Sequence, residues 1–291
     1  MADLLQIIFS GIGAGAIYAL IGLGFSIVYK ATKAINFAQG EFMMVAGIVA
    51  AVLYEKYDWP LLAAAAAVVL LGAVLGVGTD LVAVRFLRRP DPLTITIGTV
   101  GVGIATKAIV LLQTDGLSYS LPSFSTETPL EIGGALLSPQ TIWNVGLGIA
   151  ALFLLSLFFS RTRQGVSLRA SADDRDTASA FGMSFGSASM WAFGLSGALA
   201  ALAGVAITPV TLMSYQHGTE FGLIGFTAAI LGGLGSMQGA VVGGLIVGIS
   251  EALVGGYISS TYASGTAFAI LLIILFTRPN GLFRSEAIAR V

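Results

Sequence analysis

The chain has 291 residues, of which 56% are hydrophobic and only 10% are charged, and its mean hydropathy is +0.91. Soluble domains carry roughly 25% charged residues, so this composition excludes an ordinary soluble protein and indicates an integral membrane protein. The formal net charge of -1 favours no class of partner, and the absence of cysteine excludes disulfides and thiolate metal sites. The 38 glycines suit transmembrane helices that pack closely.

Long apolar segments follow one another along the whole sequence. A helix needs about 20 mostly apolar residues to cross a hydrocarbon core of roughly 30 Å. This criterion predicts an all-α membrane protein with about eight or nine transmembrane segments in a single domain, residues 1–291. The segment 221–235 is short and interrupted by glycines, so we expect it to be broken or partial. The predicted segments are Ile7–Val28, Ile35–Tyr54, Leu61–Val84, Leu93–Leu112, Thr141–Phe159, Ser187–Leu212, Phe221–Gly235, Ala240–Ile258 and Tyr262–Phe276.

Basic residues are unevenly distributed between alternate connections. Of the 14 lysines and arginines, all but Lys56 and Lys107 fall in one set of connections. The longest connection of the opposite set, residues 113–140, contains three acidic residues and no basic one. Because loops rich in lysine and arginine stay in the cytoplasm, the pattern predicts an external N-terminus, a cytoplasmic C-terminus and an external loop at 113–140.

The most polar stretch lies between two apolar segments, at residues 161–183, and carries four arginines and three aspartates. Ser171 followed by Asp174 matches a helix-capping pattern, and Gly182 suits a helix end. The pattern predicts a surface helix of about ten residues, roughly 15 Å long, which is too short and too polar to enter the bilayer. This helix is either a solvated connector or a docking element for a cytoplasmic protein.

Polar residues inside apolar segments are costly, so each is a candidate for a transport pathway. Glu41 either pairs with Lys30 or Lys33 or lines the inner end of the pathway. Lys107 lies some 14 residues into its segment. Its ammonium either extends to the outer surface or faces the pathway, and Glu251 faces either a partner subunit or a cavity. The candidate pathway residues are Asn36, Gln39, Glu41, Lys107 and Glu251.

Other titratable residues have local explanations. Asp80 lies about one helical turn before Arg85, so we expect a local ion pair. His217 and Glu220 precede the segment 221–235, where we expect an outer loop that contacts another protein or an external cap. A lone histidine does not make a metal site, and we expect no bound metal.

Glycines recur at intervals of four from residue 235 onward. This spacing lines small residues along one helix face and predicts close helix packing. It does not match a dinucleotide fingerprint, and the sequence contains neither a GxxxxGK[ST] phosphate loop nor a catalytic motif. The predicted helix-packing residues are Gly235, Gly239, Gly243, Gly244 and Gly248.

Four stretches carry a family resemblance. They are T-x-x-G-x-x-x-R-A from Thr162, GLGFSIVYKATKAINFAQGEFMMVAG at 22–47, AAILGGLGSMQGAVVGGLIVGISE at 228–251 and FTRPNGLF at 276–283. Together they extend almost from end to end and resemble the branched-chain amino acid ABC permeases of the LivH type; Met183 departs from the aliphatic residue expected there. By this resemblance, residues 161–183 form the cytoplasmic coupling loop, with ATPase-coupling positions Thr162, Gly165, Arg169, Ala170, Asp173, Ala178 and Gly182.

The resemblance implies a type II ABC importer permease fold and a subunit that imports branched-chain or related amino acids across the bacterial inner membrane. It implies a second, LivM-type permease, two cytoplasmic ATPases that use ATP and Mg²⁺, and a periplasmic solute-binding protein as partners. The chain would be a transport subunit and not an enzyme. It would bind no cofactor of its own.

Two alternatives stay open. The chain could be an ion-coupled secondary transporter or channel for a small polar solute, with Glu41, Lys107 and Glu251 as coupling groups. The substrate could also be urea, an amide or a small carboxylate, because permeases of this type resemble one another whatever they carry.

Overall fold

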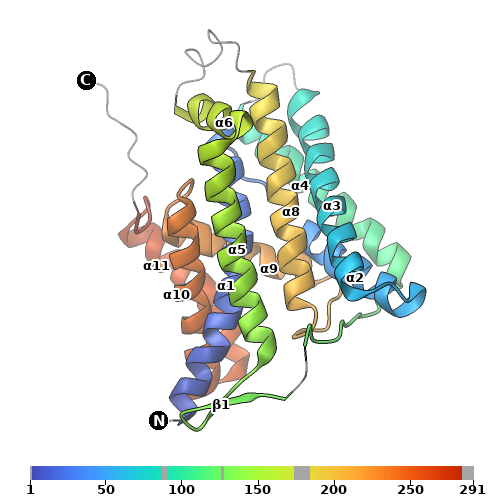
Figure 1. Ribbon diagram of the computed structural model, residues 1–291. Coiled ribbons are helices and arrows are strands. Elements are labelled where there is room, and N and C mark those ends of the chain that lie inside the picture. Colours follow the sequence, from blue (N-terminus) through green and yellow to red (C-terminus); the bar gives the residue numbers. More distant parts are fainter. Residues whose placement is uncertain (1, 87–90, 126–127, 174–183, 284–291) are drawn as a thin grey trace.

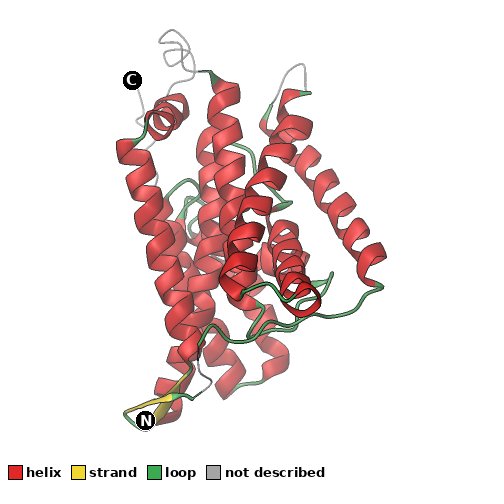
Figure 2. Cartoon of the chain, turned by 45° about the vertical axis from the view of Figure 1, so that its right-hand side comes forward, coloured by secondary structure: helices red, strands yellow, loops and turns green. Residues whose placement is uncertain are grey.

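The computed structural model describes residues 2–86, 91–125, 128–173 and 184–283. This part of the chain is a helical bundle with one short β-hairpin. The hairpin and the start of α1 lie at one end, the hairpin end, and α6 lies at the other, the α6 end (Figures 1 and 2). The elements are α1 (Ala2–Thr32), α2 (Gln39–Tyr57), α3 (Leu61–Asp80) with a π-helical turn (Leu81–Arg85), α4 (Pro92–Thr114), β1 (Leu130–Ile132), β2 (Ala135–Leu137), α5 (Pro139–Arg161), α6 (Arg163–Asp173), α8 (Phe185–Ile207), α9 (His217–Gly232), α10 (Met237–Tyr257) and α11 (Ser260–Thr277).

Seven of the described helices are long and apolar enough to cross a membrane: α1, α3, α4, α5, α8, α10 and α11. The prediction of an all-α membrane protein is therefore confirmed. The other two predicted segments are shorter or more polar. α9 has only 16 residues and begins at His217 instead of Phe221, and α2 contains Glu41, Glu55 and Lys56 within 19 residues.

α1 is the central helix of the bundle and packs against α5, α8, α9 and α10. Its contact with α10 is a seam of glycines in which the two backbones touch. A Cβ added at Gly244 would lie 2.5 Å from the Ala19 nitrogen, and one at Gly15 would lie 2.8 Å from the Leu245 Cα. No side chain larger than glycine fits at such distances, so Gly15 and Gly244 set how closely the two helices approach.

The other face of α10 packs against α9. A Cβ at Gly243 would meet the Ala228 carbonyl, and one at Gly239 would meet the Gly232 carbonyl. Gly248 lies on the α1 side with Gly244, where its Cβ would meet the Gly15 backbone. α10 thus has two glycine faces, one packed against α1 and the other against α9.

Gly235 does not belong to these faces, and its predicted place on the α10 helix is wrong. The Ser236 hydroxyl accepts a hydrogen bond from the Gly239 amide at 3.0 Å, which caps α10 and starts the helix at Met237. Gly235 precedes this cap in a turn with φ +88, a conformation that favours glycine. Gly235 therefore precedes Gly239 by four residues without lying on the same helix face.

Two contacts attach the described parts of the connection 113–140 to the bundle. Tyr119 and Met213 form a two-hydrogen-bond bridge of 2.8 and 2.7 Å, which joins this connection to the one after α8. β1 and β2 pair antiparallel, and the Leu136 amide donates to Gln6 Oε1 at 2.6 Å. The hairpin is thereby attached to the start of α1.

Asp80 and Arg85 form the ion pair expected from their spacing. Arg85 Nε lies 3.3 Å from Asp80 Oδ2, and the Ser189 hydroxyl of α8 donates to the other carboxylate oxygen. Asp80 is fully buried, and a buried carboxylate is costly unless it is paired. The Arg85 guanidinium and the Ser189 hydroxyl provide this pairing. This contact explains Asp80 without a role in transport.

The α1–α10 seam makes a testable prediction. We expect Gly244→Val to lower the thermal unfolding midpoint in detergent by several degrees, because overpacking against the Ala19 backbone costs about 1–3 kcal/mol. Gly146→Val in α5 is the matched control, since Gly146 is exposed and no atom lies within 4 Å of its added Cβ. Equal midpoints for the two variants would contradict the close approach of α1 and α10.

Candidate functional site

The connection between α1 and α2 is a non-helical break inside the bundle. Lys33, with φ +62, follows the end of α1, and the next five residues are not helical. The Ile35 amide donates to the Thr96 hydroxyl and the Phe37 amide to the Thr99 hydroxyl, both at 3.1 Å. Unpaired amides cost several kcal/mol in hydrocarbon, so these threonines of α4 stabilise the break.

Asn36 and Gln39 shape the start of α2. Asn36 Oδ1 accepts from the Ala38 amide at 3.2 Å, whereas its Nδ2 has no hydrogen-bond partner within the described part of the chain. Gln39 Nε2 donates to the Ser196 carbonyl at 3.0 Å, and the Ser196 hydroxyl donates back to Gln39 Oε1. Gln39 is fully buried against Gly24 of α1, so it joins α2 to α1 and α8.

Glu41 and Lys107 are connected through Thr219 at the start of α9. The Thr219 hydroxyl donates to Glu41 Oε1 at 2.8 Å, and Lys107 Nζ donates to the same hydroxyl at 3.0 Å. The sequence suggested that Glu41 pairs with Lys30 or Lys33. In the structure its hydrogen-bond partner is Thr219 of α9 instead. Lys107 directs its ammonium toward Thr219 of α9.

A cavity of about 280 Å³ contains both charged residues. Glu41 is only 5% exposed, and its Oε2 atom has no hydrogen-bond partner among the residues that the structure describes. Apart from the Thr219 hydroxyl, the rest of the wall is apolar or backbone, contributed by α1, the α1–α2 break, α4 and α9. These other lining residues are Phe25, Phe37, Val100, Gly103, Ile104, Gly218, Thr219, Gly222 and Leu223.

Glu251 faces a second cavity, of about 350 Å³, on the other side of α9. The Tyr18 hydroxyl of α1 donates to Glu251 Oε2 at 2.6 Å. Glu220 and His217 line the same cavity, which contains no lysine or arginine in its wall. This cavity is therefore acidic, in contrast to the one between Glu41 and Lys107.

His217 and Glu220 were expected in an outer loop, and that expectation is wrong. Both belong to the first turn of α9, where His217 Nδ1 accepts from the Ser214 amide at 3.0 Å. The His217 ring also stacks on Phe221, with ring centroids 5.8 Å apart. α9 thus begins four residues before the predicted apolar segment, which hydropathy alone could not indicate.

At the α6 end, Thr162 separates α5 from α6. Its backbone is extended, and its hydroxyl accepts from the Gly165 amide at 3.0 Å, which caps α6. A Cβ on Gly165 would meet the Phe158 carbonyl, so the sharp turn needs glycine there. The T-x-x-G part of the motif thus has a structural cause.

The capping role predicted for Ser171 is wrong, because Ser171 lies inside α6, two residues before its end. Thr162 caps α6 instead. Arg169 is exposed, Ala170 is half-buried, and Asp173 is the last residue of α6. The predicted coupling residues Ala178 and Gly182 lie outside the described residues, as does most of the predicted helix.

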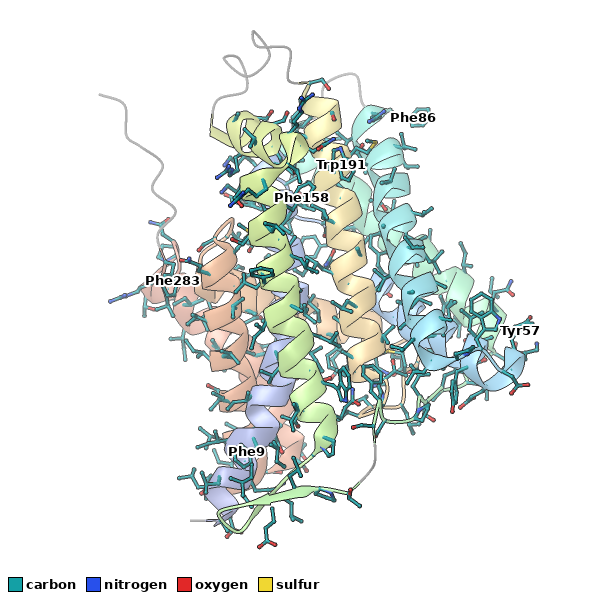
Figure 3. All side chains as sticks on the ribbon, in the orientation of Figure 1. Phe9, Tyr57, Phe86, Phe158, Trp191 and Phe283 are labelled. Atoms are coloured by element: carbon teal, nitrogen blue, oxygen red, sulfur yellow. The ribbon has the colours of Figure 1, made fainter. Side chains whose placement is uncertain are left out.

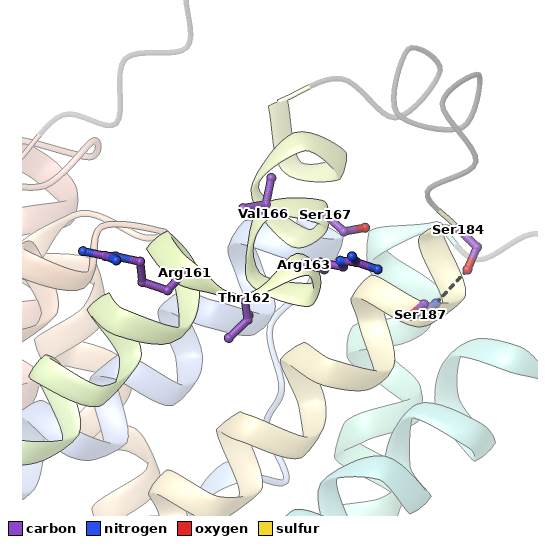
Figure 4. Close-up of a pocket in the computed structure, with 7 residues that line it drawn as sticks. All are labelled: Arg161, Thr162, Arg163, Val166, Ser167, Ser184 and Ser187. Carbon is purple, nitrogen blue, oxygen red and sulfur yellow. Dashed lines mark hydrogen bonds between the residues drawn. The ribbon is translucent and has the colours of Figure 1, made fainter.

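A surface pocket of about 560 Å³ lies beside α6 (Figure 4). Arg163 points toward the start of α8, and Arg161 points the opposite way (Figure 4). Below this pocket, Phe158 of α5 and Trp191 of α8 approach to 5.9 Å between ring centroids (Figure 3). The pocket with its two arginines therefore lies next to the packed Phe158 and Trp191 rings. Its lining residues are Arg161, Thr162, Arg163, Val166, Ser167, Ser184 and Ser187.

Sequence reasoning missed the residues that connect the candidates. Thr219, Thr96 and Thr99 are single hydroxyls in apolar surroundings, and nothing in their local pattern indicates a partner. Tyr18 is 233 residues from Glu251. Only a rule that treats every polar residue of an apolar segment as paired could have selected them.

These findings define a multi-pass membrane permease, and comparison with known proteins gives its family. Residues 7–276 match the family described as branched-chain amino acid transport system, permease component, and the chain belongs to that family. It is therefore a transport subunit. No solved structure matches the chain.

Similar proteins extend over almost the whole chain. The high-affinity branched-chain amino acid transport system permease protein LivH of Escherichia coli K12 is 32% identical, covering 99% of this chain and 97% of the relative. The corresponding protein BraD of Pseudomonas aeruginosa is 30% identical over 99% and 98%. The autoinducer 2 import system permease protein LsrC of Escherichia coli is 28% identical over 79% and 65%.

The Gln39–Ser196 contact makes a testable prediction. We expect Gln39→Met to destabilise the purified protein by about 1–3 kcal/mol, because it leaves the buried Ser196 hydroxyl without its partner. Adding Ser196→Ala should recover part of this loss in a double-mutant cycle of thermal unfolding. Gln216→Met is the control, since the Gln216 amide contacts Tyr215 at the exposed surface. Strictly additive effects of the two buried substitutions would contradict the pairing.

Proposed function

We propose that this chain is the membrane-spanning subunit of an ATP-binding-cassette importer for branched-chain or related amino acids. The observation that carries the proposal is similarity over 99% of the chain to permeases of branched-chain amino acid systems in two bacteria. The bundle supports it, since its apolar helices surround buried polar contacts. We assign it the type II importer fold, with the α6 end cytoplasmic and the hairpin end outside the bacterial inner membrane.

The energy for import would come from partner subunits. Our proposal includes two cytoplasmic ATPases that use ATP and Mg²⁺, a LivM-type second permease and a periplasmic solute-binding protein, and no cofactor bound by this chain. The coupling loop 161–183 would receive the ATPases. Its support is the rigid base of α6: Thr162 and Gly165 hold it at a sharp angle to α5, and Leu168 is fully buried.

The pathway would pass the broken starts of α2 and α9. Broken helices at membrane depth place free backbone groups and polar side chains where a solute can reach them. Of the five candidate residues, Glu41 and Lys107 share one cavity and Glu251 lines another, whereas Asn36 and Gln39 organise the start of α2.

The docking role of α6 is tested by charge reversal. We expect Arg163→Glu or Arg169→Glu to reduce co-purification of the ATPases at least about tenfold, because charged contacts at an interface contribute on the order of 1–3 kcal/mol. Lys56→Glu, at an exposed position in the last turn of α2, is the matched control and should leave recovery unchanged. If all three variants retain the ATPases equally, α6 is a solvated connector.

An ion-coupled secondary transporter is the second candidate, and the buried pair Glu41 and Lys107 is the observation that favours it. Reconstitution separates the two functions. The chain alone in vesicles should take up no leucine under a proton or sodium gradient. The complex with its partner subunits should take up leucine only when ATP is present on the ATPase side. Robust uptake by the chain alone would establish ion coupling instead.

A further inference from the structure

Two helices begin near the middle of the bundle and bring their first turns together. α9 runs beside α1, with its first turns at the level of Tyr18 and its later residues at the level of Phe25, as the ring contacts of Phe221 and Phe226 show. Tyr18 lies about 24 Å along a helix of roughly 45 Å at 1.5 Å per residue. α9 therefore starts near the middle of α1.

The start of α2 meets the start of α9 at the same depth. A Cβ at Gly40 would overlap the Gly218 carbonyl, and one at Gly218 would overlap the Glu41 carboxylate. These glycines let two helix N-termini and one carboxylate occupy the same small volume. The free N–H groups and the positive dipole end of α9 lie beside this volume.

Lys107 brings the opposite charge from α4. It lies 15 residues after Pro92, about 22 Å along that helix, so it too lies well inside the predicted membrane segment. Among the described residues, no direct ion pair joins Lys107 to Glu41, because the Thr219 hydroxyl stands between them. Each charged group thus keeps bonding capacity: Lys107 has further N–H donors, and Glu41 Oε2 is unpartnered.

We propose that this cavity binds an amino acid as its zwitterion, with the substrate ammonium at Glu41, the substrate carboxylate at Lys107 and the aliphatic side chain against Val100, Ile104 and Leu223. This inference rests on the proposed function and adds which residues recognise the substrate. The cavity has a volume of about 280 Å³ and contains one cation, one anion, the Thr219 hydroxyl that joins them, and otherwise apolar side chains. The cation, the anion and the apolar surface match the three parts of a branched-chain amino acid.

The charges of Glu41 and Lys107 favour a zwitterion over urea, neutral amides and simple carboxylates. Urea and neutral amides cannot neutralise Glu41 and Lys107, and a simple carboxylate would leave Glu41 without a cation. The second cavity, with Glu220 and Glu251, has no lysine or arginine in its lining to pair with a carboxylate. Thr219 is a positioning residue, since it holds both charged groups through a single hydroxyl.

The absence of native cysteine permits a direct test of occupancy. Val100→Cys, in the wall of the cavity, is labelled with a water-soluble maleimide in the assembled complex. The matched control is Leu111→Cys, three turns further along the same helix, with nearly the same exposure: 40% against 38% for Val100. At ten times its dissociation constant, leucine should slow labelling of Val100→Cys about tenfold, because only the free fraction reacts, and should not slow labelling of Leu111→Cys.

Analogues and charge variants then identify the contacts. Leucinol, which lacks the carboxylate, and N-acetylleucine, which lacks the ammonium, should each protect with at least about tenfold weaker affinity than leucine. In the Lys107→Met background leucine should fall to the affinity of leucinol, and leucinol itself should be unaffected. In the Glu41→Gln background leucine should fall to the affinity of N-acetylleucine, with N-acetylleucine unaffected.

A purely structural role has a different signature. The zwitterion site would be refuted if Lys107→Met lowered the affinities for leucine and leucinol equally. It would also be refuted if leucinol protected the Val100→Cys protein, without a charge substitution, as well as leucine does. Failure of the proposed function is separate. ATP-dependent leucine uptake without protection of Val100→Cys refutes the site alone, and protection without ATP-dependent uptake refutes the ATP-driven function alone. Ligand-free labelling at the wild-type rate shows that each charge variant is folded.

Discussion

The need to pair every backbone polar group in an apolar environment is the constraint on which this structure depends. Most of the chain meets it with continuous helices. At the α1–α2 break the helix stops, and Thr96 and Thr99 of α4 replace the missing intrahelical partners. This replacement holds α4 against the break and so places Lys107, on the same helix, beside α2 and α9.

Close approach of backbones is the second cause of the arrangement. Glycines on two faces of α10 bring α1 and α9 to it, and Gly40 and Gly218 bring the first turns of α2 and α9 together. Hydrocarbon offers no hydrophobic drive for helix association, so close packing of this kind has to supply the attraction. The candidate cavity is therefore a product of packing between short and long helices, and its charged residues come from two of them.

The two ends of the bundle have distinct chemistry. At the α6 end, exposed arginines surround a pocket above the Phe158–Trp191 contact. At the hairpin end, the β-hairpin and the Tyr119–Met213 bridge tie loops to α1 and to each other. The first arrangement is suited to an acidic or polar docking partner, and the second stabilises the ends of the helices. The partly buried contacts of Glu41 and Glu251 lie between the two.

The sequence by itself determined the membrane class and the shortness of α9, because hydropathy over about 20 residues is a local property. It predicted eight or nine crossing segments, of which seven are long and apolar enough to span. It also determined the Asp80–Arg85 pair, since the two residues are one turn apart on one helix. The sequence did not predict the start of α6. The S-x-x-D pattern at Ser171 suggested a helix start there, whereas the Thr162 hydroxyl caps α6 at its actual start. Gly235 was assigned to a packing face for the same reason, as spacing does not reveal where a helix begins.

Only the tertiary structure decided which polar residues meet. Glu41, Lys107 and Thr219 come from three helices, and Tyr18 and Glu251 are 233 residues apart, so no local pattern links them. The tertiary structure also placed His217 and Glu220 in the first turn of α9, where His217 contacts the Ser214 amide and the Phe221 ring. Partner choice inside a membrane depends on helix packing in three dimensions, and that packing arises from glycine contacts between distant segments.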